Sequence, residues 1–188
     1  MPNIEIKVRY PDLEKARRIA QALQTQYVGV LDQTDTYFKT NTGRLKLREF
    51  GSGPAQLIPY QKSYAAAPSR SDYALMTVED PALVKRLFGL LLGIEFVVAK
   101  HREVFLIENV RIHLDEVAGL GNFVEFEAVF TTDTHQARAL ETSKVERLME
   151  LFEIKASDLM TQSYVDCLSI QKPYTASAAT STSDIAPH

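Results

Sequence analysis

Residues 109–128 read NVRIHLDEVAGLGNFVEFEA and contain two runs in which charged and apolar side chains alternate. A period of two is typical of β-strands, and the glycines at 119 and 121 mark a turn. The stretch therefore predicts two antiparallel strands, at about 109–117 and 122–131. The polar positions that share one face of these strands are Arg111, His113, Asp115, Glu125 and Glu127.

The same alternation recurs along the rest of the chain. Further strands are predicted at 3–10, 28–40, 44–50, 55–63, 72–79 and 95–107, and amphipathic helices at 12–23, 80–92, 134–152 and 157–169. Eight strands in one series predict an α+β fold, an eight-stranded antiparallel β-barrel with flanking helices over residues 1–170. Residues 171–188 are mostly small, polar and aperiodic, which predicts a disordered C-terminal tail.

Composition narrows the class of protein. The 188 residues are 45% hydrophobic and 24% charged with a net charge of −3, so no strong basic field indicates a nucleic-acid partner. A single cysteine, Cys167, excludes an intrachain disulfide and a cysteine-based zinc site. The N-terminal residues lack the apolar stretch of a signal peptide, and the longest apolar run, 87–94, is too short for a membrane span. A cytoplasmic protein without a membrane partner is expected.

Charges on the alternating positions are sorted by strand. Cations occupy one face at Arg44, Lys46 and Arg48 and again at Lys100 and Arg102, whereas acids occupy Glu125 and Glu127. Any single strand of this kind is typical of a sheet with one solvated face. Several such strands together favour an interior that is lined by charge, with the apolar faces packed against the helices.

The charged residues suit one class of ligand. Arginine binds phosphate oxygens two at a time and lysine binds them as a point charge, so the cations indicate a polyphosphate. Carboxylates such as Glu5, Asp115, Glu125 and Glu127 are hard oxygen donors that suit Mg²⁺ or Mn²⁺. Tyr37 and Phe38 allow stacking on a base, although aromatic residues in strands more often belong to the core.

Several short stretches resemble a known family. The segments NIEIK at 3–7, DTYF at 35–38, GRLKLRE at 43–49, RIHLDEV at 111–117 and GLGNFVEFE at 119–127 are similar to blocks of CYTH domains, the triphosphate tunnel metalloenzymes. The resemblance extends over about residues 1–168. Within the family the chain looks most similar to the class IV adenylyl cyclases, through RSDY at 70–73 and RIHLD at 111–115.

The resemblance implies a set of site residues. The residues implied to bind the triphosphate are Lys7, Arg44, Lys46, Arg48, Lys62, Lys100, Arg102 and Arg111, with catalytic roles for Lys7, Arg48 and Arg111. The residues implied to bind Mg²⁺ or Mn²⁺ are Glu5, Asp115, Glu125 and Glu127. Asn3 stands where the family signature has its first Glu, so one ligand keeps an oxygen but loses its charge. The family also allows a homodimer.

Three functions follow from the resemblance as alternatives. The first is a class IV adenylyl cyclase-like enzyme that converts ATP to cyclic AMP and pyrophosphate. The second is a triphosphatase that hydrolyses inorganic, thiamine or nucleoside triphosphate. The third, motivated by Asn3, is a protein that binds a nucleotide or polyphosphate without turnover.

Overall fold

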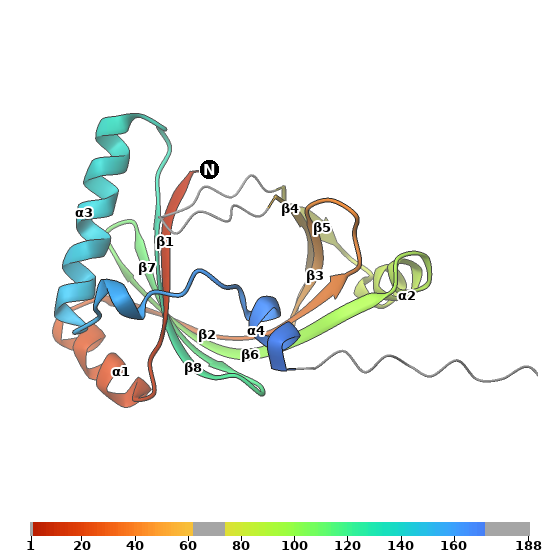
Figure 1. Ribbon diagram of the computed structural model, residues 1–188, viewed down its shortest axis with the longest axis horizontal. Coiled ribbons are helices and arrows are strands. Elements are labelled where there is room, and N and C mark those ends of the chain that lie inside the picture. The colour runs from red at the N-terminus through yellow and green to blue at the C-terminus, as the bar shows by residue number, and fades with distance from the viewer. Residues whose placement is uncertain (1, 62–73, 172–188) are drawn as a thin grey trace, which may run out of the picture.

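The computed structural model describes residues 2–61 and 74–171 (Figure 1). Eight strands form one antiparallel sheet in the order β1-β8-β7-β6-β2-β3-β4-β5, which confirms the predicted eight-stranded antiparallel architecture. The strands are β1 (Asn3–Arg9), β2 (Gln26–Phe38), β3 (Arg44–Phe50), β4 (Ala55–Tyr60), β5 (Met76–Val78), β6 (Ile94–Ile107), β7 (Val110–Val117) and β8 (Gly121–Val129).

The sheet curls into a cup. The long strands β2 and β6 form its floor, with β1, β7 and β8 rising on one side and β3, β4 and β5 on the other (Figure 1). Among the described strands no pairing joins β1 to β5, so these two are the edges of the sheet. The predicted barrel is therefore a curled sheet that hydrogen bonds do not close within the described part of the chain. We call the concave face and the space it surrounds the cup.

Two helices cover the outer face of β1, β7 and β8. They are α1 (Leu13–Ala22) and α3 (His135–Leu151), and each begins with a side-chain cap from Asp12 or Thr134. Their apolar stripes pack on the apolar positions of the three strands, where Ile112 and Phe126 are fully buried. Because successive strand residues point to opposite faces, this packing directs the charged positions of the same strands into the cup.

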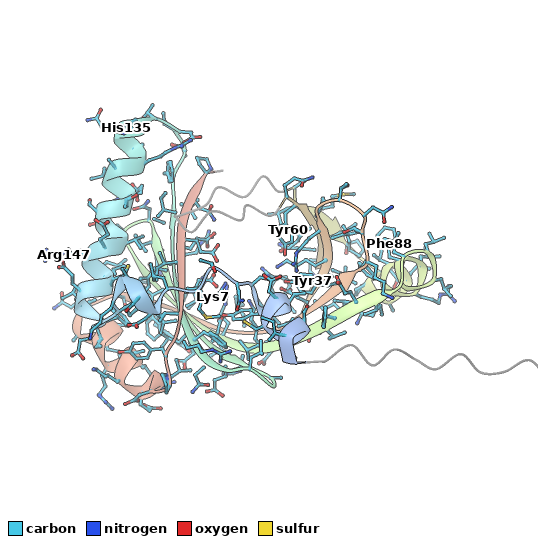
Figure 2. The ribbon with its side chains drawn as sticks, viewed as in Figure 1. Lys7, Tyr37, Tyr60, Phe88, His135 and Arg147 are labelled. Atoms are coloured by element: carbon cyan, nitrogen blue, oxygen red, sulfur yellow. The ribbon has the colours of Figure 1, made fainter. Side chains whose placement is uncertain are left out.

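A third helix, α2 (Pro81–Leu91), covers the outer face of β2 and β3. The Phe88 ring meets the Phe38 ring edge-on at 5.5 Å, beside buried Leu47 and partly buried Val84 (Figure 2). Burial of Phe38 and Leu47 on this side leaves the alternate positions of β2 and β3 for the cup.

The C-terminal helix differs from its prediction. Residues 157–169 do not form one helix, because a 3-10 turn (Ala156–Asp158) is followed by an extended stretch that forms an antiparallel bridge between Leu159 and Val8. Helix α4 (Tyr164–Gln171) begins only after this stretch. Ser163 starts the helix, since its backbone N–H and its hydroxyl both donate to the Asp166 carboxylate at 2.8 Å. The bridged, extended stretch thus interrupts the predicted helix, and the Ser163 cap sets where α4 begins.

Helix α4 lies inside the cup, whereas the other helices lie outside it. Tyr164, Val165 and Cys167 are buried against Val98 and Phe123 of the inner face. Apart from Gln171, the predicted tail lies outside the described residues, as do the ends of the strands predicted at 55–63 and 72–79. No described helix has the length and apolarity that a membrane crossing requires.

Candidate functional site

The cup brings together charged residues from strands that are distant in sequence. Strand register sets the meetings: Lys7 of β1 lies opposite Glu125 of β8, and Arg102 of β6 lies opposite Asp115 of β7. Figure 2 shows Lys7 on the β1 side of the cup and Tyr37 and Tyr60 on the β3 and β4 side. The predicted convergence of cations and carboxylates on one interior is therefore present.

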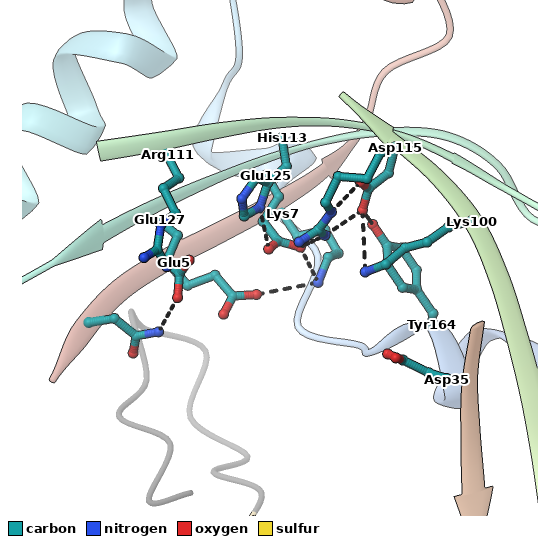
Figure 3. Close-up of polar contacts among 12 residues, drawn as sticks. Glu5, Lys7, Asp35, Lys100, Arg111, His113, Asp115, Glu125, Glu127 and Tyr164 are labelled. Atoms are coloured by element: carbon teal, nitrogen blue, oxygen red, sulfur yellow. Dashed lines mark hydrogen bonds and ion pairs between the residues drawn. The ribbon is translucent and has the colours of Figure 1, made fainter. Parts of the chain in front are cut away.

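One buried ion network occupies the β1, β6, β7 and β8 side of the cup (Figure 3). Arg102 donates two hydrogen bonds of 2.6 Å to Asp115 and a third of 3.2 Å to Glu125. Lys7 lies 3.0 Å from Glu125 and 3.3 Å from Glu5. Burial by itself would raise the pKa of Asp115 and of Glu125, but Arg102 and the neighbouring lysines Lys100 and Lys7 together outweigh it, and both pKa values are lowered. Both carboxylates are thus ionised at neutral pH.

His113 belongs to the same network. Its Nδ1 lies 3.0 Å from Oε1 of Glu125, and the side chain is almost fully buried. Burial, followed by the positive charge of Arg102, lowers the pKa of His113, so the neutral imidazole is favoured at pH 7. His113 is thus a buried hydrogen-bonding partner of the Glu125 carboxylate.

A second cluster lies on the opposite wall. Arg48 donates to both oxygens of Asp35 at 2.7 and 2.8 Å, and Lys46 donates to the same carboxylate at 3.0 Å. Asp35 is 3% exposed, and its pKa is lowered because these cations outweigh the effect of burial. Asp35 was absent from the predicted site residues. The available signal was its place two residues before Tyr37, on the strand face that alternates away from buried Phe38 and Thr36.

Two lysines of the cup have lowered pKa values. Burial, with repulsion from Arg102 as the next cause, lowers the pKa of Lys100 to about 7. Burial also lowers the pKa of Lys46 to about 8, although Asp35 acts in the opposite direction. An anion that enters the cup would favour the charged form of both side chains.

Other predicted cations lie outside the buried network. Arg111 is half exposed and bonds Oε2 of Glu127 at 3.0 Å, while the Asn3 amide donates to Oε1 at 3.1 Å. Arg44 bonds Asp166 of α4 at 2.6 Å, a partner that the sequence did not indicate. Lys62 lies outside the described residues.

Two of the predicted metal ligands, Glu5 and Glu127, are cross-strand neighbours, and all four of them already contact cations of the protein. Glu5 and Glu127 are directly opposite in the β1–β8 register, and burial followed by the charge of Glu125 raises the pKa of Glu5. A divalent cation would relieve the repulsion between the Glu5 and Glu125 carboxylates. Together with Glu127, these two residues supply the hard oxygens that Mg²⁺ and Mn²⁺ prefer. Within residues 2–61 and 74–171, no three acidic, His or Cys side chains are grouped to hold a metal. The donor chemistry fits, and the metal site stays a prediction.

Solved structures share this fold. A Pyrococcus horikoshii OT3 protein, PH1012, matches with a TM-score of 0.77 and 21% identity over 88% of this chain and 98% of its own. A candidate adenylate cyclase from Vibrio parahaemolyticus matches with a TM-score of 0.73 and 20% identity, over 90% and 98% of the two chains. A candidate adenylyl cyclase from Hippeastrum, described as having a dominant triphosphatase activity, matches with a TM-score of 0.64 and 16% identity, over 93% and 98% of the two chains.

At these identities the likeness concerns the fold alone, and no curated protein matches the chain. The match at the level of sequence families is more specific. The family model of the CYTH domain matches residues 1–164, which include every strand and the first residue of α4. By this match, the chain belongs to the CYTH domain family.

Proposed function

We propose that this chain is a metal-dependent enzyme that binds the triphosphate group of its substrate in the cup. The observation that carries the proposal is the pair of facing cation clusters. Lys7, Lys100 and Arg102 face the cup from one side, and Lys46 and Arg48 face it from the other. Cations on two sides suit an elongated anion whose successive phosphates are gripped from both walls.

The arginines of the site are held in position before a ligand binds. Asp115 fixes the guanidinium of Arg102 and Asp35 fixes that of Arg48, each through two hydrogen bonds. A guanidinium that is already oriented loses less conformational entropy when it binds phosphate. The lysines are less strongly paired and would supply the point charges.

The carboxylates Glu5, Glu125 and Glu127, together with the side-chain oxygen of Asn3, would hold Mg²⁺ or Mn²⁺. When bound, the metal would neutralise phosphate charge and bridge phosphate oxygens. Glu125 also bonds Lys7, Arg102 and His113, so this chain couples its candidate metal ligands directly to its candidate phosphate ligands.

For the reaction we favour an adenylyl cyclase-like step. The ribose 3′-hydroxyl of ATP loses its proton to water and attacks the α-phosphorus, the bond to the bridging oxygen of the β-phosphate breaks, and pyrophosphate leaves. The residues of the cup would hold the triphosphate in line and stabilise the charge on the leaving group. This choice rests on the sequence blocks that resemble class IV adenylyl cyclases.

A triphosphatase is the second candidate, and the Hippeastrum neighbour is the observation that favours it. In that reaction water attacks a phosphorus of the bound triphosphate. The same cation clusters would serve both reactions, which differ in the phosphorus that lies in line with the attacking oxygen. Binding without turnover is the third outcome, and it is motivated by Asn3.

A substrate panel tests the proposal. The purified chain is incubated with ATP, tripolyphosphate or thiamine triphosphate and with Mg²⁺ or Mn²⁺, and products are identified by mass spectrometry. Cyclic AMP with pyrophosphate supports the cyclase, and release of phosphate supports the triphosphatase. Glu125→Gln should abolish turnover, whereas Glu103→Gln is the matched control, because Glu103 pairs with Arg17 of α1 on the outer face. A chain that binds none of the three compounds contradicts the proposal.

A further inference from the structure

Tyr164 enters the cup from α4 and contacts both the acids and the cations of the ion network (Figure 3). Its hydroxyl donates to Oδ2 of Asp115 at 2.7 Å. The centre of its ring lies 4.6 Å from Nζ of Lys7 and 5.4 Å from Nζ of Lys100. The ring is held in turn by an edge-on contact with Phe123 at 4.9 Å. In the sequence, Tyr164 lies within the stretch predicted as a helix at 157–169, and its pattern indicates no role in the site.

The hydroxyl of Tyr164 supplies the second hydrogen bond to one carboxylate oxygen of Asp115. Oδ2 accepts from Arg102 and from Tyr164, and a carboxylate oxygen has two lone pairs to offer. Nζ of Lys100 stays 3.9 Å from the same oxygen, too far for a hydrogen bond. In the described part of the chain, Lys100 donates no hydrogen bond to any side chain, so its ammonium keeps donors for a ligand.

The ring of Tyr164 has a second effect on the lysines. An aromatic face attracts an ammonium group without using any of its N–H donors. Lys7 and Lys100 are both within range of the ring, and their side chains are 14% and 4% exposed. The ring thus compensates part of the cost of burying two positive charges while leaving their hydrogen-bonding capacity available.

We propose that Tyr164 is a positioning residue of the triphosphate site, whose hydroxyl saturates Asp115 and whose ring supports Lys7 and Lys100 so that both lysines present their donors to phosphate. This inference rests on the proposed function. Its rival is that Tyr164 only fills space beneath α4, in which case phenylalanine should serve equally well.

Binding of tripolyphosphate in EDTA, measured by titration calorimetry, separates the two. Removing the hydroxyl frees a lone pair on Asp115 that Lys100 can occupy, which withdraws Lys100 from the ligand. Tyr164→Phe should therefore weaken binding roughly three- to tenfold, the usual effect of one such hydrogen bond. Tyr164→Leu loses the ring as well and should bind more weakly again. Tyr10→Phe is the matched control, because that hydroxyl donates to the Phe152 carbonyl outside the cup and should leave affinity unchanged.

A double-mutant cycle tests whether Tyr164 acts through Lys100. In a Lys100→Met background, Tyr164→Phe should cost clearly less affinity than it does in the natural chain. If Tyr164→Phe leaves the affinity for tripolyphosphate unchanged, or lowers it equally in both backgrounds, the positioning role is refuted and the proposed function still stands. If the natural chain binds no tripolyphosphate, the proposed function and the role of Tyr164 both fail. The two failures are thus distinguishable.

Discussion

Arg102 and Asp115 face each other across β6 and β7 and are joined by two hydrogen bonds of 2.6 Å, deep in the cup where Asp115 is fully buried. The pairing links a predicted phosphate ligand to a predicted metal ligand. Arg48 with Asp35, and Arg44 with Asp166, repeat the arrangement on the other side. Each of these arginines is therefore oriented by a carboxylate of the protein, and an anionic ligand that entered the cup would meet guanidinium groups that already have a partner.

The Arg102–Asp115 pair should be important for stability. Asp115→Asn removes the negative charge and leaves Arg102 buried with Glu125 as its remaining acid. Losing one partner of a buried pair typically costs about 3–5 kcal/mol, because the other charge stays desolvated. Urea unfolding should show a loss of this order. Glu153→Gln, which removes an exposed partner of Lys15, should shift the urea midpoint far less. Equal shifts in the urea midpoint would mean that the buried Arg102–Asp115 pair contributes no more to stability than the exposed Lys15–Glu153 pair.

Arg48 should act through the shape of its guanidinium as well as through its charge. Arg48→Lys keeps the charge but loses the planar fork that now engages both oxygens of Asp35. We expect affinity for tripolyphosphate to fall about tenfold or more, the range for hydrogen bonds to charged groups. Arg86→Lys on α2 changes the same residue type on the outer side of the sheet and should have no effect. Full affinity in Arg48→Lys would mean that charge alone suffices.

Glu5 should matter for metal binding and little for the stability of the metal-free chain. Its pKa is raised by burial and by Glu125, although Lys7 acts in the opposite direction, so ionising Glu5 costs more in the folded chain than in the unfolded chain. Glu5→Gln should weaken Mn²⁺ binding, measured by electron paramagnetic resonance, without lowering the melting temperature in EDTA. The control is Glu103→Gln, whose carboxylate has a partner in Arg17 outside the cup. Undiminished Mn²⁺ affinity in Glu5→Gln would remove Glu5 from the metal site.

Lys100 should couple ligand binding to protonation. Its pKa is about 7 in the folded chain against an ordinary 10.5, and a bound polyphosphate would raise it. Binding near pH 8 should therefore take up as much as about one proton at this lysine. Calorimetry in buffers of different ionisation enthalpy measures the uptake. Lys100→Arg, which stays charged, should lower it, and equal uptake in both proteins would assign the proton to other groups.

The same lysine gives a signed effect of pH on stability. Between about pH 7 and 10.5 the unfolded chain binds more protons at Lys100 than the folded chain does, so the free energy of unfolding contributed by Lys100 rises with pH in that window. Below about pH 7 both states are protonated and this contribution is constant. Comparison of urea unfolding between the natural chain and Lys100→Met over this range should show a smaller slope in the variant.

Much of the fold could be predicted from local pattern. The alternation in 44–50, 109–117 and 122–131 predicted which residues share a face, because side chains in a strand point to opposite sides with a period of two. That rule depends only on local geometry. Because the apolar face of each strand must be buried against helices, the charged face is left for the interior. Charged positions such as Arg48, Arg102 and Glu125 could therefore be assigned to one interior without coordinates.

The tertiary structure decided which side chains contact one another in the cup. Asp35, Tyr164 and Asp166 pair with predicted site residues, but strand register and the path of α4 determine which residue each one contacts, and both depend on contacts between distant segments. The helix predicted at 157–169 failed for the same reason, since the bridge from Leu159 to Val8 extends the chain where local propensity favours helix. Sequence alone determined which side chains face inward, because that follows from geometry along one strand. Only the tertiary structure decided which carboxylate pairs with which cationic side chain, because these pairings depend on the register between strands.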